Sequence, residues 1–129
     1  MKLAIVEANM TGIQHSYPNG VYVRLLADIV GRKNVHLYCS KEHLEAMNIN
    51  YKGIKYTPID VVPNHHSRIH KFLLEYKNTF SVLNNSHADI VIFLSSYPDI
   101  QYPIIQKAIK GKINKKVIIF THGELEGLL

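Results

Sequence analysis

The sequence contains one cysteine, no tryptophan and no long uninterrupted run of apolar residues. A single cysteine, Cys39, can form no internal disulfide and can supply no cysteine-rich metal site. No apolar stretch approaches the ~20 residues that a membrane-spanning helix needs. The first apolar run ends at Glu7, so it is too short for the hydrophobic core of a signal peptide. We therefore expect a cytoplasmic protein without disulfides.

The motifs of common nucleotide-binding and metal-binding sites are also missing. No glycine lies between Gly12 and Gly20, so the dinucleotide fingerprint G-x-G-x-x-G does not follow the first predicted strand. No Gly-Lys-Ser or Gly-Lys-Thr step marks a phosphate-binding P-loop, and no His-Glu-x-x-His motif marks a zinc site. The sequence thus predicts neither a nicotinamide cofactor nor a bound metal.

The composition is that of an ordinary globular domain with an excess of lysine. Apolar residues make up 47% and charged residues 19% of the 129 residues. The net charge is +5, and five lysines fall within residues 107–116. A solvated surface explains this group; attraction to anionic lipid head groups or to a phosphorylated ligand, with weak peripheral membrane contact, is the alternative. No aromatic residues alternate with the basic ones, so we expect no nucleic-acid partner.

Hydrophobic periodicity predicts strands and helices in alternation along the chain. The predicted strands are short apolar runs at residues 2–7, 35–39, 54–60, 88–94 and 116–120. The predicted helices carry apolar residues at helical spacing and cover residues 20–30, 41–47, 67–83 and 100–109. Pro58 cannot donate a backbone hydrogen bond, so the third strand should lie near an edge of the sheet.

The most regular apolar stripe falls within residues 67–83. Its members recur at the spacing of one helix face: Ile69, Phe72, Leu73, Tyr76, Phe80 and Leu83. We expect this stripe to pack on the sheet, because amphipathic helices of globular domains bury their apolar face. A surface or membrane-facing helix is the alternative.

Strands that alternate with helices, with the central strands continuously apolar, are typical of a parallel sheet with right-handed crossovers. We expect an α/β, Rossmann-like, doubly wound domain of about five strands in the order 3-2-1-4-5, with helices on both faces. Ligands of such sheets bind at the carboxyl ends of the strands, where the order reverses between strands one and four. Three loops should meet there, at residues 8–19, 95–99 and 121–124.

These loops carry the candidate site residues. His15 and His122 each follow a predicted strand, and a histidine there can act as a general base or donate a hydrogen bond to a sugar hydroxyl or a phosphate. A histidine that caps backbone carbonyls in a tight turn is the alternative for both. The candidate binding residues in the same loops are Gly12, Ser95, Ser96 and Gly123.

Three stretches carry a likeness to a known family. Lys2-Leu3-Ala4-Ile5-Val6 is followed by a glycine-containing loop and by Asn19-Gly20-Val21-Tyr22-Val23 at the start of a helix. Asp89-Ile90-Val91-Ile92-Phe93 is a strand that begins with an acid. Val117-Ile118-Ile119-Phe120-Thr121-His122-Gly123-Glu124 is a strand followed by a histidine. Together they resemble the amino-terminal, acceptor-side domain of GT-B glycosyltransferases of the group 1, retaining type, and the likeness spans the whole chain.

The resemblance implies an enzyme of carbohydrate biosynthesis that transfers a sugar from a nucleotide-sugar donor, a co-substrate and not a cofactor, to a glycan or lipid-linked acceptor. In that family the amino-terminal domain binds the acceptor, and a second Rossmann-like domain holds most of the nucleotide-sugar site. The loop with Gly12 would approach the donor phosphates, and His122 would touch the transferred sugar as the catalytic residue. No metal is implied.

The chain ends at Leu129, one helical turn after the last predicted strand, where a crossover helix should begin. We therefore expect residues 1–129 to be one domain that is inactive alone, with the carboxyl-terminal donor-binding domain and its glutamate pair outside this chain. Glu124 and Glu126 fit the opening of a helix instead. Two alternatives stay open, namely the amino-terminal half of a nucleotide-sugar epimerase and a stand-alone flavodoxin-like ligand-binding module.

Overall fold

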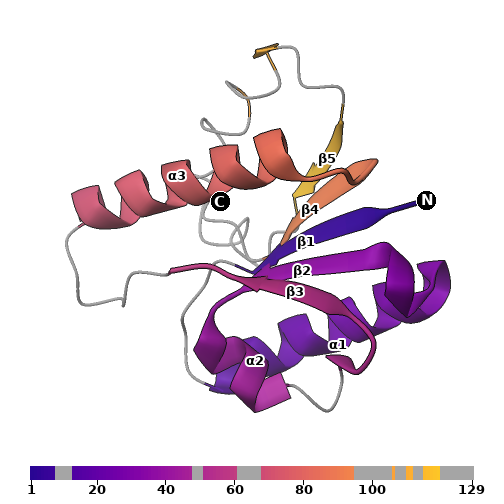
Figure 1. The fold of residues 1–129 in the computed structure, drawn as a ribbon. Helices are drawn as coiled ribbons and strands as arrows, with labels where there is room; N and C mark the ends of the chain where they lie inside the picture. Colours follow the sequence, from indigo (N-terminus) through magenta and orange to yellow (C-terminus); the bar gives the residue numbers. More distant parts are fainter. Residues whose placement is uncertain are drawn as a thin grey trace, which may run out of the picture.

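The strands described form one parallel sheet in the order β3-β2-β1-β4-β5, which confirms the predicted α/β fold (Figure 1). The computed structural model describes residues 1–7, 13–47, 51–60, 68–94, 106, 110–111 and 115–119. The strands are β1 (Leu3–Glu7), β2 (Val35–Cys39), β3 (Lys55–Pro58), β4 (Ile90–Leu94) and β5 (Lys116–Ile119). The helices are α1 (Ile13–Val30), α2 (Lys41–Met47), α3 (Arg68–Asn85) and the short 3₁₀ helix η1 (Arg32–Asn34).

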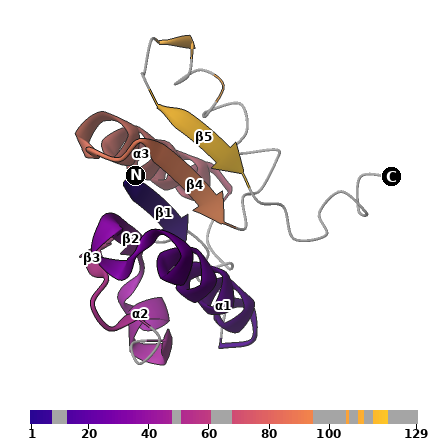
Figure 2. The ribbon, with the colours of Figure 1, turned by 90° about the vertical axis from the view of Figure 1, so that its right-hand side faces the viewer.

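The register of the strand pairs brings the carboxyl ends of the central strands together. Glu7 of β1 pairs with Cys39 of β2 on one side and with Leu94 of β4 on the other. Phe93 of β4 pairs with Ile119 of β5. Since every pair is parallel, β1, β4 and β5 end at the same edge, as Figure 2 shows. The strand order reverses between β1 and β4, so this edge holds the switch point of the fold.

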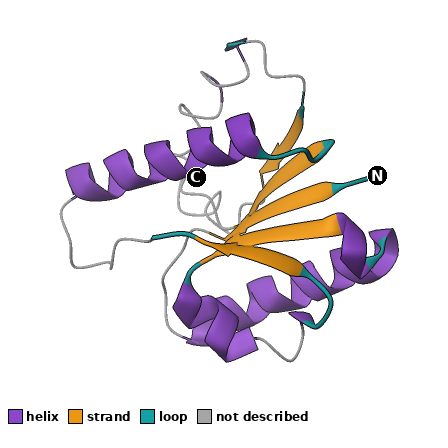
Figure 3. Ribbon diagram, viewed as in Figure 1, coloured by secondary structure: helices purple, strands orange, loops and turns teal. Residues whose placement is uncertain are grey.

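Helices cover both faces of the sheet and give the domain three layers. α1 and α2 lie on one face, and α3 lies on the other (Figure 3). On the first face, Val23 and Ala27 of α1 and Met47 of α2 belong to a core with residues of β1, β2 and β4. On the second face, Val82 and Leu83 of α3 pack with residues of β1 and β4. β1 is buried along its whole length because it lies under helices on both sides.

Several helices and strands begin or end at the residues that the sequence predicts, because single side chains fix the boundary. The hydroxyl of Ser40 accepts a hydrogen bond of 3.1 Å from the backbone N–H of His43 and so caps the amino end of α2. Gly31 follows the last residue of α1 with a φ of 94°, a left-handed conformation that favours glycine. Pro58 lies in β3, which is an edge strand as expected. The predicted helix over residues 100–109 falls largely outside the described residues.

Helix α1 begins at Ile13 and not at Gly20, so the predicted loop over residues 8–19 is wrong from Ile13 onward. The helix contains Pro18. A proline inside a helix removes one backbone hydrogen bond and costs about 3 kcal/mol, which is why the sequence favours a helix that starts after it. Here the proline lies toward the amino end, and contacts further along, at Val23 and Ala27, hold the helix on the sheet.

Helix α3 packs on the sheet through its carboxyl-terminal part. Val82 and Leu83 are buried, but Ile69 and Leu73 of the predicted stripe are 72% and 58% exposed. A helix of 18 residues is about 27 Å long, whereas a strand of 5 residues spans about 17 Å, so the helix is longer than the sheet beneath it. The prediction that the whole stripe packs on the sheet is therefore wrong for its first part, which extends past the carboxyl edge (Figure 1).

Candidate functional site

Most of the predicted site residues fall outside the part of the chain that the structure describes. They are Gly12, Ser95, Ser96, His122 and Gly123. The described strands end shortly before them in the sequence, since Glu7 closes β1, Leu94 closes β4 and Ile119 closes β5. His15 lies in the first turn of α1, because the helix starts earlier than expected, so the prediction of a loop histidine is wrong.

A buried polar cluster lies at the carboxyl ends of β1 and β2. It contains Glu7, His43 and Tyr51, each at most 4% exposed, and the thiol of Cys39. The Nε2 atom of His43 lies 2.5 Å from the Tyr51 hydroxyl, and the two rings stack with 5.6 Å between their centroids. Because Ser40 caps the helix that carries His43, the cap also fixes where this ring enters the core.

Burial sets the protonation states in this cluster. Burial first, and then the negative charge of Glu7, raise the pKa of the Cys39 thiol to about 12. The pKa of Tyr51 is also raised, by burial first and by Cys39 and Glu7 after it. Burial lowers the pKa of His43 to about 4, so the imidazole is neutral near pH 7. The Cys39 thiol is therefore not a thiolate nucleophile at neutral pH, and the His43 ring keeps a single N–H.

The hydrogen bonds of His43 indicate its tautomer. Its Nδ1 atom is buried and has no hydrogen-bond partner among the described residues. A neutral imidazole has one N–H, and an unpaired buried donor costs free energy. Placing the proton on Nε2, where it is donated to the Tyr51 hydroxyl, leaves Nδ1 as a bare acceptor and avoids a buried unpaired donor. The contact between His43 and Tyr51 thus joins α2 to the segment that leads into β3.

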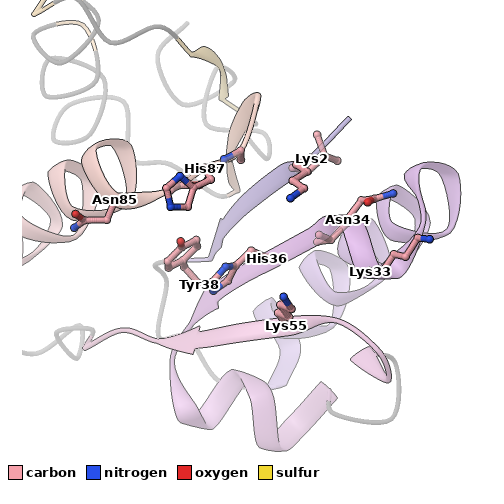
Figure 4. Close-up of a pocket in the computed structure, with 12 residues that line it drawn as sticks. Lys2, Lys33, Asn34, His36, Tyr38, Lys55, Asn85 and His87 are labelled. Atoms are coloured by element: carbon pink, nitrogen blue, oxygen red, sulfur yellow. Dashed lines mark hydrogen bonds between the residues drawn. The ribbon is translucent and has the colours of Figure 1, made fainter.

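A second polar region is a pocket of about 220 Å³ at the opposite, amino-terminal edge of the sheet (Figure 4). The polar residues that line it are Lys2, Lys33, Asn34, His36, Tyr38, Lys55, Asn85, Ser86 and His87. They come from η1, from β2, from the starts of β1 and β3, and from the end of α3 and the segment that joins it to β4. The pocket therefore joins segments that are far apart in the sequence.

This pocket was not predicted from the sequence, because the expected site of an α/β sheet is its carboxyl edge. One signal was present in β2. His36 and Tyr38 alternate there with the buried residues Val35, Leu37 and Cys39. Such alternation indicates a strand with one face open to solvent, whereas the central strands of a fully covered parallel sheet are apolar on both faces.

The described residues contain no group of three His, Cys, Asp or Glu side chains placed to hold a metal ion. None of the described helices combines the length and the apolar character that a bilayer crossing needs. Comparison with known proteins adds no further constraint, because no family model, no curated protein and no solved structure matches the chain. The function is therefore argued from the fold, the two polar regions and the sequence.

Proposed function

We propose that this chain is the amino-terminal, acceptor-side domain of a GT-B glycosyltransferase with a nucleotide sugar as donor. The observation that carries the proposal is the sheet, whose strands β1, β4 and β5 end side by side where the strand order reverses. Ligands of open α/β sheets bind at such a point. Gly12, Ser95 and His122 follow these three strand ends in the sequence, which is where the resemblance puts the sugar-binding loops.

The proposed reaction is a transfer of one glycosyl group. The acceptor hydroxyl oxygen forms a bond to the anomeric carbon of the donor sugar, and the bond from that carbon to the nucleotide phosphate breaks. The hydroxyl proton passes to a base in the cleft, and the nucleoside diphosphate leaves. In this proposal His122 contacts the transferred sugar, the loop with Gly12 faces the donor phosphates, and Ser95, Ser96 and Gly123 line the cleft. A carboxyl-terminal domain supplies the rest of the donor site.

The strand order distinguishes this proposal from the flavodoxin-like alternative. A flavodoxin-like sheet has the order 2-1-3-4-5, in which strand one lies between strands two and three. Here β1 lies between β2 and β4, which is the Rossmann arrangement. A flavodoxin-like module is therefore disfavoured. A nucleotide-sugar epimerase would share the Rossmann arrangement, so it must be separated from a transferase by experiment.

The first test is the sequence of the gene beyond codon 129. We expect the reading frame to continue into a second α/β domain that carries two glutamates on one face of a helix. A stop codon directly after Leu129 would contradict the proposal, and so would a continuation into an unrelated fold. This test needs no knowledge of the donor sugar or of the acceptor.

The second test is His122→Ala in the full-length enzyme. Loss of one contact made in the transition state should lower kcat by about 100-fold, because such contacts contribute a few kcal/mol. Turnover is measured as release of nucleoside diphosphate from a panel of nucleotide sugars with added acceptor. The control is Asn84→Ala, which changes an exposed residue near the carboxyl end of α3 that does not line the pocket. Equal kcat for wild type and His122→Ala would remove His122 from the site, and epimerisation of the donor without transfer would favour the epimerase.

A further inference from the structure

The described helices cover the face of the sheet that carries α3 over only part of its width. Over β1 and β4 this face is apolar, and Val6 and Phe93 are buried beneath α3. Over β2 and β3 the same face presents His36, Tyr38 and Lys55, which are half-buried or exposed. Tyr38 packs against the edge of the apolar cluster under α3, whereas the polar residues His36 and Lys55 lie beyond it. Parallel sheets are normally covered on both faces, so these polar residues are unusual there.

Three lysines line the pocket at this part of the sheet. Lys2 precedes β1, Lys33 lies in η1 and Lys55 begins β3, and all three line the pocket. Figure 4 shows the side chains of Lys2 and Lys55 reaching toward the same space from either side of β2, with Lys33 at one end. Among the described residues, no carboxylate forms an ion pair with any of these ammonium groups. Gathering unpaired like charges destabilises a fold, and a bound anion would offset that cost.

The acid at this edge of the sheet is already engaged with the backbone. One carboxylate oxygen of Asp89, Oδ2, accepts a hydrogen bond of 2.9 Å from the backbone N–H of Lys2. This contact joins the starts of β1 and β4 and holds the backbone of Lys2 in place. The carboxylate thus positions the backbone of Lys2, and among the described residues it forms no ion pair with the Lys2 ammonium group.

Two stacked rings, those of His36 and Tyr38, line the pocket between the lysines. The rings of His36 and Tyr38 stack with 4.4 Å between their centroids and 10° between their planes. Thr57 of β3 positions the His36 ring, because the Thr57 hydroxyl lies 2.6 Å from His36 Nε2. Burial first, and then the charge of Lys55, lower the pKa of His36, so the imidazole is neutral near pH 7. Because both rings are uncharged, they can contact the organic part of a ligand, while the lysines contact its charged phosphate.

We propose that this pocket binds a small phosphate ester, with the phosphate between Lys2 and Lys55 and the organic part on the His36–Tyr38 stack. The pocket volume of about 220 Å³ limits the ligand size, because pockets for drug-sized ligands and cofactors have about 300–1,000 Å³. A whole nucleotide sugar is too large, and a phosphate on a three- to six-carbon unit fits. Phosphate esters of this size occur both as free metabolites and as lipid head groups. The site lies at the edge opposite to the proposed transferase cleft and does not depend on it.

The experiment is an amide NMR titration of the 129-residue chain with glycerol phosphate and with inorganic phosphate. We expect saturable shifts at His36, Tyr38 and Lys55, and none with glycerol, which lacks the charge. Lys2→Gln and Lys55→Gln should each weaken binding at least about tenfold, the loss expected for one charge-assisted contact. The matched control is Lys41→Gln, which removes an equal charge from an exposed lysine of α2 on the other face of the sheet.

A vesicle assay separates the two sources of the phosphate ester. The chain is sedimented with phosphatidylcholine vesicles that do or do not contain phosphatidic acid, whose head group is a phosphate monoester. Binding that requires phosphatidic acid and is lost in Lys55→Gln would support the site with a lipid as its ligand. Glycerol phosphate binding without vesicle binding would support the site with a soluble ligand.

Two results would overturn the pocket assignment. One is the absence of saturable shifts with any phosphate probe. The other is an equal loss of affinity in Lys41→Gln and Lys55→Gln, which would show that the anion responds to net charge alone. Neither result bears on the transferase proposal, because His122→Ala and the gene sequence test the opposite edge of the sheet. Lys2 and Lys55 side chains are exposed at the surface, so their substitution leaves the core intact.

Discussion

The two described polar regions each contain a histidine stacked on a tyrosine, and the pairs differ in burial and in hydrogen bonding. His43 and Tyr51, at the carboxyl edge, are almost fully buried and share a hydrogen bond of 2.5 Å. His36 and Tyr38, which line the pocket at the amino edge, are half-buried, and their ring planes are 10° apart. In the first pair His43 lies on α2, and both rings are buried. In the second pair both residues line a pocket that is open to solvent. Residue type alone therefore does not distinguish a structural pair from a binding surface; what covers it does.

The largest difference between the pairs should appear in stability. His43→Ala removes a buried ring and leaves the Tyr51 hydroxyl without its partner, so we expect the free energy of unfolding to fall by about 4 kcal/mol. His36→Ala, the matched change in the open pair, should cost less than about 1 kcal/mol. Urea denaturation followed by circular dichroism measures both. Similar losses for the two variants would mean that the open pair is also part of the core.

A second difference should appear as the pH falls. The folded pKa of His43 is about 4, whereas an unfolded histidine titrates near its ordinary value of 6.5. The unfolded chain therefore takes up the proton first, and stability decreases as the pH falls from about 6.5 to about 4. The loss attributable to this residue is about 3 kcal/mol at most.

Urea denaturation across this pH range measures the effect in three proteins. The loss should persist in His36→Gln and largely disappear in His43→Gln, while carboxylates contribute equally to all three. Direct titration of the His43 ring by NMR provides an independent check. A ring that titrates near 6.5 in the folded chain would show that it is open to water.

The smallest expected effect is the influence of Lys55 on the pKa of His36. The charge of Lys55 contributes to lowering the pKa of His36, after burial. Lys55→Gln should therefore raise the pKa of His36 and leave that of His43 unchanged, because Lys55 does not act on the buried ring. The change is read from the NMR titration of both rings in the two proteins. An unchanged pKa for His36 would show that burial alone lowers it and that Lys55 does not act on this ring.

The elements whose ends are set by local chemistry could be predicted from the sequence. β2 and α2 have the predicted bounds, since Ser40 caps the helix and polar residues flank the strand. The order of the sheet also followed, because apolar central strands alternating with helices allow few topologies. The start of α1 did not follow, because packing of Val23 and Ala27 outweighs the local penalty of Pro18.

The sites were harder to predict than the fold. The predicted residues at the carboxyl edge, except His15, lie outside the described part of the chain, so their roles stay predictions. The pocket at the amino edge joins Lys2, His36, Lys55 and His87, whose positions span most of the described chain. No sequence spacing marks such a group, because it is assembled by strand pairing and by the place where α3 ends.

What the sequence determined by itself was the alternation of strands and helices, and with it the parallel sheet and the edge position of β3. These follow from periodicity and from Gly and Pro chemistry, which act over a few residues. Only the tertiary structure decided that His43 is buried and His36 partly exposed, and how much of the sheet α3 covers. Burial depends on the lengths and crossings of whole elements: α3 leaves the face over β2 and β3 open, and the exposed lysines meet there.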